Sequence, residues 1–166
     1  AIRHGGQRVT RGERYVLGAF LLIEDRVEHV RRFKNRGAHY RSQGKLLEAI
    51  EQFKYALAIN PQCTTCLKDW AEILHVQGDY VGAEHKLRRA LELLEYKDSD
   101  AWFTLGLVLS EQGLHREEEC IDAYRQSLAL NDEDAELLYN LAIKIGDRHR
   151  RIGCDGIAEE MKLYAR

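Results

Sequence analysis

The chain has 166 residues, of which 45% are hydrophobic and 31% charged, and its net charge is −2. This balance is ordinary for a soluble globular protein. The longest apolar run, residues 16–23, is far shorter than the roughly 20 residues that cross a membrane, so we expect no membrane span and no membrane partner. Residues 1–60 carry a charge of +6 and the rest −8, which either favours an acidic partner for the basic part or reflects solvated helix faces.

Residues 1–24 stand apart from the rest of the chain, because Gly5, Gly6 and Gly12 interrupt any helix. Residues 14–23 are rich in aromatic and aliphatic side chains, which predicts a β-strand paired with a short strand near residues 7–10. An isolated hairpin is marginally stable in water, so this one must pack against something. The chain starts at Ala1, in the middle of what looks like a motif, and we therefore expect it to be a piece of a longer protein.

The stretch H-G-G-Q-R-V-T-R-G-E-R-Y-V-L, residues 4–17, resembles the C-terminal end of the catalytic domain of Fe(II)/2-oxoglutarate dioxygenases of the prolyl and lysyl hydroxylase type. The resemblance implies that His4 is an iron ligand and that Arg14 binds the distal carboxylate of 2-oxoglutarate, with ascorbate as a further candidate cofactor. These residue types suit the chemistry, because such enzymes hold iron with two His and one carboxylate, and the Arg fork matches a carboxylate.

The H-x-D motif that would supply the other two iron ligands is missing from residues 1–24. We therefore expect no cofactor and no activity for this chain alone, and an enzyme only if a longer protein supplies the catalytic core. Alternatively, His4 is simply a polar residue of a leading hairpin.

From residue 25 onward the apolar pattern becomes helical, with Val27, Val30 and Phe33 at helical spacing in what we predict to be one helix entering the first repeat. The same helix carries a basic run within residues 31–36. Since aromatic residues do not interleave with these charges beyond Phe33, we interpret the run as a solvated helix face and expect no nucleic-acid partner.

Small, aromatic and apolar residues recur at fixed offsets over residues 33–61: Phe33, Gly37, Tyr40, Ala49, Phe53, Ala56 and Pro61. This spacing resembles the tetratricopeptide (TPR) repeat, a pair of antiparallel helices, and departs from it at Phe33, where Trp is usual, and at Arg36, where Leu is usual. We expect Gly37 to face Ala49 and Ala56 across the hairpin. Gly44 is expected to end the first helix and Pro61 the second.

The pattern returns 34 residues later and then twice more, with two extra residues in the third hairpin and four in the first helix of the fourth. The resemblance covers residues 30–166, in repeats of about 30–63, 64–97, 98–134 and 135–166. We therefore predict a mainly α fold: an α-solenoid of about four TPR hairpins over residues 25–166, with eight helices between residues 27 and 164 and a short N-terminal β-hairpin remnant. Suitable helix N-caps are Thr64 or Thr65, Ser99 and Asp132, and turns fall at Asn60 and Asn131.

The TPR resemblance implies a protein–protein interaction module that binds peptides or scaffolds partners, attached to the end of the hydroxylase suggested by residues 1–24. A purely structural TPR adaptor without a catalytic domain is the alternative. The compartment stays open between the cytoplasm and, for a procollagen-hydroxylase-like protein, the secretory pathway. The first helices of the repeats would line a groove with a basic and an apolar end, formed by Arg31, Lys34, Arg41, Lys68, His75, Phe103, Leu107, Tyr139 and Ile143.

One class of peptide is disfavoured by the sequence. TPR co-chaperones that hold the acidic C-terminus of heat-shock proteins use a carboxylate clamp of Lys and Asn in the first repeat, Asn in the second, and Lys and Arg in the third. The corresponding residues are Lys34, Ala38, Asp69, Asp100 and Thr104. Since only Lys34 matches and the two aspartates would repel a carboxylate, we expect heat-shock C-terminal peptides to be poor partners.

Four cysteines remain, two of them in the C-T-T-C segment of Cys63 and Cys66 at the junction of the first two repeats. A metal site would need a second pair, and only the isolated Cys120 and Cys154 are available. We interpret the cysteines as structural, with redox or metal chemistry as the alternative.

Overall fold

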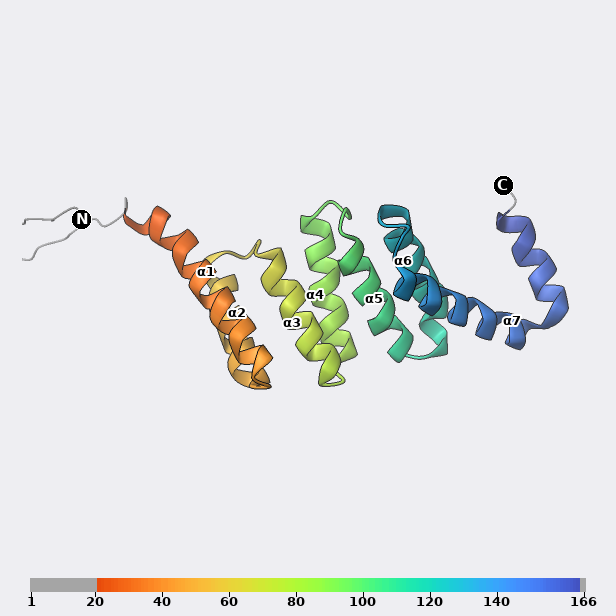
Figure 1. Ribbon diagram of the computed structural model, residues 1–166, viewed down its shortest axis with the longest axis horizontal. Helices are drawn as coiled ribbons and strands as arrows, with labels where there is room; N and C mark the ends of the chain where they lie inside the picture. The colour runs from red at the N-terminus through yellow and green to blue at the C-terminus, as the bar shows by residue number, and fades with distance from the viewer. Residues whose placement is uncertain (1–20, 165–166) are drawn as a thin grey trace, which may run out of the picture.

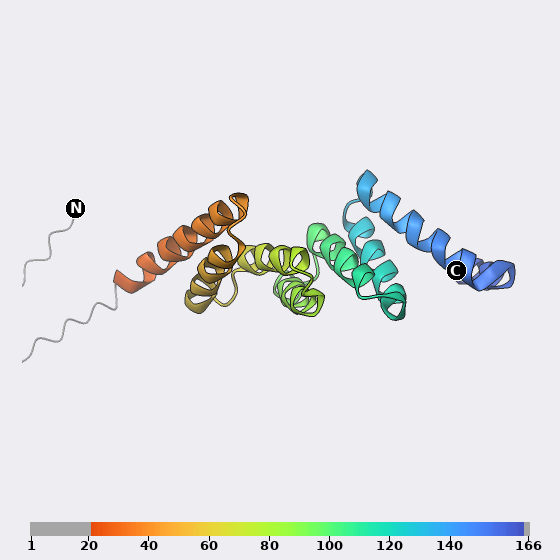
Figure 2. The ribbon, with the colours of Figure 1, turned by 90° about the horizontal axis from the view of Figure 1, so that it is seen from below.

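A computed structural model describes residues 21–164, which form one elongated row of helices (Figures 1 and 2). Within this range the chain has no β-strand, and its seven α-helices are α1 (Leu21–Ser42), α2 (Leu46–Ile59), α3 (Thr64–Val76), α4 (Tyr80–Leu93), α5 (Ser99–Glu111), α6 (Glu117–Leu130) and α7 (Ala135–Tyr164). A short 3₁₀ turn, η2 (Leu114–Arg116), precedes α6. The predicted mainly α solenoid is confirmed.

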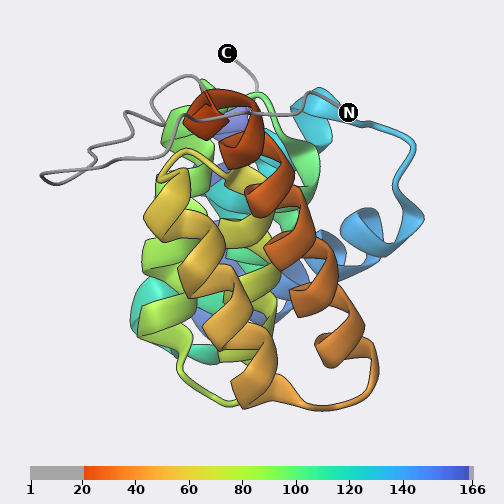
Figure 3. The ribbon, with the colours of Figure 1, turned by 90° about the vertical axis from the view of Figure 1, so that its left-hand side faces the viewer.

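Neighbouring helices pack in pairs, α1 with α2, α3 with α4 and α5 with α6, and each pair contacts the next. The view along the row shows α1 and α2 lying side by side, with the later pairs stacked behind them (Figure 3). Each pair buries its apolar face against its neighbours, so the core extends along the row. No helix among residues 21–164 is long and apolar enough to cross a membrane.

The predicted N-terminal strand is wrong where the structure can test it. Residues 21–23, the end of that predicted strand, form the first turn of α1. Ile23, Val27 and Val30 continue one helical period in the sequence, and this period extends the entry helix toward the N-terminus. The rest of the hairpin prediction, including His4 and Arg14, lies outside the described residues.

The fourth predicted pair falls within α7, in which two helical segments meet at Gly153, whose φ of 71° is not helical. The eight predicted helices therefore correspond to seven elements, because the last two are joined without a separate turn. The segments before and after this break run in different directions (Figure 1). The other pairs close through short turns with a positive-φ glycine at Gly44, Gly78 or Gly113. Gly153 has a positive φ like these glycines, but helical residues follow it directly, without the short turn that the other pairs have.

The core follows the predicted spacing of small residues. Ala49 and Ala56 in α2, and Ala71, Ala83 and Ala90 in the second pair, are fully buried. Gly37, however, does not primarily approach Ala49 and Ala56: a Cβ on Gly37 would stand 2.5 Å from Cε1 of Phe53. The glycine therefore makes room for the Phe53 ring, and the alanines are buried beside it.

The helix N-caps lie one or two residues from the predicted ones. Asp98 and Asp134 occupy the positions expected for Ser99 and Asp132, and α3 begins after Cys63 rather than at a threonine cap. Asp98 and Asp134 each accept the backbone N–H of the third helical residue through a side-chain oxygen, which is the usual N-cap bond. Asn60 and Asn131 lie at the ends of α2 and α6, as predicted.

Candidate functional site

The nine predicted groove residues lie on α1, α3, α5 and α7, the first helices of the pairs, and we call them together the A-helix surface. Its basic residues come from α1 and α3. Arg31 is exposed and pairs with Glu28 on its own helix, with Nη2 and Oε2 2.6 Å apart. His75 is half-buried, and its ring centroid lies 5.9 Å from that of Tyr80.

Arg41, in the last turn of α1, reaches across to α3. Its Nη1 lies 3.1 Å from Oδ1 of Asp69 and also donates to Glu72. The side chain of Asp69 is only 16% exposed. Burial raises the pKa of Asp69, against the lowering effect of the positive charges of Arg41, Lys34 and Lys68. One arginine that the sequence assigned to peptide binding is therefore already paired with carboxylates of the chain itself.

Lys68 repeats this arrangement at the next junction. Its Nζ lies 2.7 Å from Oδ2 of Asp98, and both side chains are at most one-quarter exposed. The other oxygen of Asp98 accepts the backbone N–H of Ala101 at 2.7 Å and so caps α5. Asp98 therefore contacts both the start of α5 and Lys68, and the ion pair between Lys68 and Asp98 joins α3 to α5.

The apolar end of the A-helix surface divides into two parts. Phe103 and Leu107 of α5 are partly buried against the core cluster to which α7 contributes its buried leucines. In contrast, the side chains of Tyr139 and Ile143 on α7 are 67% and 40% exposed. The α5 residues therefore take part in the packing of the core, whereas the α7 residues present apolar surface to solvent.

The acidic partners of Arg41 and Lys68 are the part of this surface that the sequence reading missed. The sequence does contain a signal for them, because ion pairs between neighbouring helix pairs join residues 28 to 34 positions apart. Examples are Arg41–Glu72, Lys68–Asp98, Arg88–Glu119 and Arg116–Glu84. An acidic residue about one repeat away from each cation would have identified the pairing.

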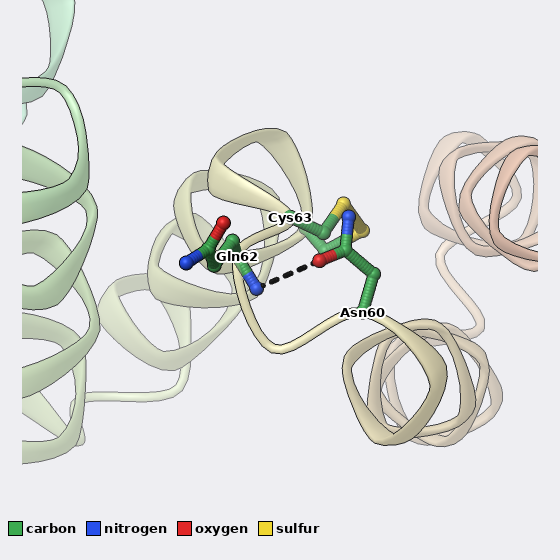
Figure 4. The surroundings of a disulfide bond; sticks show 4 residues. Asn60, Gln62 and Cys63 are labelled. Atoms are coloured by element: carbon green, nitrogen blue, oxygen red, sulfur yellow. Dashed lines mark hydrogen bonds between the residues drawn. A yellow bond between two sulfur atoms is a disulfide. The ribbon is translucent and has the colours of Figure 1, made fainter. Parts of the chain in front are cut away.

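The C-T-T-C segment closes on itself as a disulfide between Cys63 and Cys66. Cys63 is the N-cap of α3 and is half-buried, whereas Cys66 is fully buried. Asn60 lies beside the disulfide and accepts the backbone N–H of Gln62 through its side-chain oxygen at 3.0 Å (Figure 4). Among the side chains that the structure describes, no group of three His, Cys, Asp or Glu could hold a metal ion.

Comparison with known proteins gives a likeness in structure only. No protein-family model and no curated protein matches the sequence. The first TPR domain of Spaghetti (RPAP3) bound to the HSP90 peptide SRMEEVD is similar with a TM-score of 0.68 and 20% sequence identity, over 72% of this chain and 93% of that one. The Sgt2 TPR domain from Aspergillus fumigatus is similar with a TM-score of 0.66 and 19% identity, over 75% of this chain and 82% of that one. The second TPR domain of human RPAP3 with the HSP70 peptide SGPTIEEVD is similar with a TM-score of 0.66 and 18% identity, over 72% of this chain and 97% of that one. The described part of this chain therefore has the fold of TPR domains.

Proposed function

We propose that this chain is a protein-interaction module whose A-helix surface binds a peptide segment of a partner protein. The observation that carries the proposal is the exposure of Tyr139 and Ile143 on α7, whereas Phe103 and Leu107 of α5 are half-buried against the core cluster that also contains buried leucines of α7. An exposed aromatic residue beside aliphatic ones is the kind of anchor that peptide segments dock against. TPR domains of the same fold bind peptides, including SRMEEVD and SGPTIEEVD.

The charges of this surface indicate which peptides fit. Arg41 and Lys68 are engaged with Asp69, Glu72 and Asp98, so the basic end offers less positive potential than its sequence suggests. At the position where an acidic peptide would need an uncharged hydrogen-bond donor, this chain has the carboxylate of Asp69. We therefore propose that the partner peptide is held by apolar side chains at the α5–α7 end, and that SRMEEVD-type acidic termini bind poorly.

A displayed library of random 12-residue peptides, selected on the whole chain, tests this proposal. We expect the selected peptides to carry aromatic or aliphatic residues and to lose about tenfold or more in affinity for Tyr139→Ala/Ile143→Ala, because truncating an apolar anchor costs at least about 1.4 kcal/mol. Val81→Ala is the matched control, since Val81 is 72% exposed on the second helix of its pair. Selected peptides that bind the double variant as well as the original chain would contradict the proposal and favour the plain structural adaptor.

The hydroxylase attachment is a separate proposal that rests on residues 4–17 of the sequence. His4 would supply one iron ligand and Arg14 the fork for 2-oxoglutarate in a longer protein. The gene sequence upstream of Ala1 tests it most directly: an H-x-D motif some tens of residues before His4 supports it, and a further TPR repeat there contradicts it. In such a longer protein, Arg14→Ala is expected to weaken 2-oxoglutarate binding and His4→Ala to abolish iron-dependent activity.

A further inference from the structure

We propose that the Cys63–Cys66 pair is a thiol–disulfide exchange site, at which an external thiol of the glutathione or dithiol class attacks the sulfur of Cys63. The pair lies between α2 and α3, and its function is independent of the A-helix surface. Three observations on the described residues support it: the unequal burial of the two cysteines, the position of Cys63 at a helix start, and backbone hydrogen bonds that hold the turn.

The two cysteines differ sharply in accessibility. Cys66 is 0% exposed and belongs to the core cluster formed by α2 and α3 with Phe53 and Ile73. Cys63 is only half-buried and sits in the turn that connects the two helices. Since thiol–disulfide exchange requires a thiolate to reach one sulfur, attack occurs at Cys63 and the sulfur of Cys66 is the leaving group.

Cys63 also occupies a position that three other helices give to an aspartate, whereas the N-caps of α2 and α6 are Lys45 and Arg116. At the N-caps of α4, α5 and α7 an aspartate accepts the N–H of the residue three positions on: Asp79 from Gly82, Asp98 from Ala101 and Asp134 from Leu137. Cys63 is the N-cap of α3, makes no such hydrogen bond, and is instead bonded to the side chain three positions on, that of Cys66. Once the disulfide opens, a Cys63 thiolate can take over the capping role, and the positive end of the α3 dipole favours its negative charge.

The turn itself does not depend on the disulfide. The backbone N–H of Cys63 donates to the carbonyl of Asn60 at 3.1 Å, and that of Asn60 donates to the carbonyl of Ala56 at 2.9 Å. The side-chain oxygen of Asn60 accepts the N–H of Gln62 from beside the sulfurs (Figure 4). These bonds remain after reduction, so exchange takes place in the folded chain.

The reaction balances with two equivalents of thiol. One thiolate attacks the Cys63 sulfur, a mixed disulfide forms, and the electron pair of the broken S–S bond goes to the Cys66 sulfur, which takes up a proton. A second thiolate then attacks the external sulfur of the mixed disulfide and releases Cys63 as a thiolate. The net products are two cysteine thiols in the chain and one oxidised external disulfide.

The proposal is tested by measuring how fast each of the two cysteines reacts when the other is replaced, in the full chain that also carries Cys154→Ser. With Cys66→Ser, oxidised glutathione should modify Cys63, whereas with Cys63→Ser the remaining Cys66 should react about tenfold or more slowly, as buried thiols are inert. Peptide mass spectrometry locates the adduct. Cys120 is the internal control: it is fully buried, and burial raises the pKa of its thiol to about 11. A reacting Cys120 reveals unfolding, in which case Cys66→Ala replaces Cys66→Ser.

The intact pair is then treated with dithiothreitol or reduced glutathione, followed by iodoacetamide. Supporting results are a carbamidomethyl group on Cys63 of the folded chain after the dithiol, with the buried Cys66 modified only once the chain is unfolded in urea, and a mixed disulfide at Cys63 with the monothiol. The helical circular dichroism should be unchanged before the urea is added. Equal rates for Cys63 and Cys66, or reduction only under conditions that also expose Cys120, would overturn the proposal and leave a purely structural disulfide.

Discussion

Gly106 of α5 lies against the ring of Tyr124 of α6 so closely that a Cβ on Gly106 would stand 2.4 Å from Cε1 of the ring. Gly37 and Phe53 repeat this contact in the first pair. At the same places in the second pair stand Ala71 and Leu87, both fully buried. Where the first helix of a pair has alanine instead of glycine, the second helix has leucine instead of an aromatic residue. This indicates that the two side chains together fill a space of fixed volume where the helices cross.

Gly106→Ala is therefore expected to destabilise the chain, although alanine favours a helix over glycine by about 1 kcal/mol. The added methyl group must displace a fully buried aromatic ring, and such overpacking costs about 1–3 kcal/mol. Urea unfolding followed by circular dichroism should show a lower midpoint.

The second pair suggests a rescue of that variant. Gly106→Ala combined with Tyr124→Leu reproduces the Ala71–Leu87 combination in the third pair. The double variant should lose less free energy of unfolding than the two single variants together, by about 1 kcal/mol. Strict additivity would mean that the two positions do not share one space.

Ala83→Leu tests the packing of the second pair. Ala83 is fully buried in one cluster with Ala71 and Leu87, so three additional carbon atoms have no room. We expect a loss of about 1–3 kcal/mol in the free energy of unfolding. Val81→Leu, two residues away and 72% exposed, is the control and should leave the midpoint unchanged. An equally unchanged midpoint for Ala83→Leu would show that the repeat frame is wrong.

Glu84 joins the second and third pairs and gives a pH-dependent prediction. Burial raises the pKa of Glu84, but hydrogen bonds from Arg116, Gln112 and Arg88 outweigh it and hold the pKa at about 2. Because this pKa is below the ordinary 4.5, the contribution of Glu84 to stability is fully present above pH 4.5 and is lost as the pH falls toward 2.

Glu84→Gln should therefore lower the free energy of unfolding at pH 7 by about 2–3 kcal/mol, and this deficit should shrink as the pH falls from 5 to 2. Urea midpoints measured across that range check the prediction. Glu92→Gln is the matched control, since Glu92 forms a half-exposed pair with Arg89, and such pairs contribute little. A deficit that is constant with pH would assign the effect of Glu84 to packing instead of charge.

The repeat spacing predicted the helix pairs because few residue types fit a close helix crossing or a left-handed turn. Ala49, Ala56, Ala83 and Gly44 are such residues, and the structure places them as expected. The prediction of strand at residues 21–23, the start of α1, fails because the aliphatic and aromatic residues of 14–23 suit both a strand and a helix. The break at Gly153 differs from the other turns, and the fourth repeat also lacks the aromatic residue that would have marked its second helix, since Lys162 stands there.

The candidate site was less predictable than the fold. Which surface residues lie on α1, α3, α5 and α7 follows from helical periodicity. Whether Arg41 faces a ligand or an acidic neighbour depends on where side chains of the next pair reach, and periodicity does not contain that information. The Cys63–Cys66 bond is likewise a local closure that a three-residue spacing permits but does not require.

Asp69 gives the sharpest test of the proposal that acidic peptide termini bind poorly to this chain. It stands where the carboxylate clamp carries Asn, and its carboxylate pairs with Arg41. Asp69→Asn keeps the shape of the side chain and removes the negative charge near Lys34, while Arg41 keeps its pairing with Glu72. We expect fluorescence polarisation with labelled SRMEEVD to show a gain in affinity of about tenfold, and a larger gain when Asp100→Lys is added at the exposed position 100. The gain should be smaller at high salt because the attraction is electrostatic.

Glu92→Gln is the control for Asp69→Asn: it changes the net charge equally but lies on the second helix of its pair, so it should leave the affinity unchanged. If Asp69→Asn does not raise the affinity even at low salt, the charge of Asp69 is not what excludes the acidic peptide.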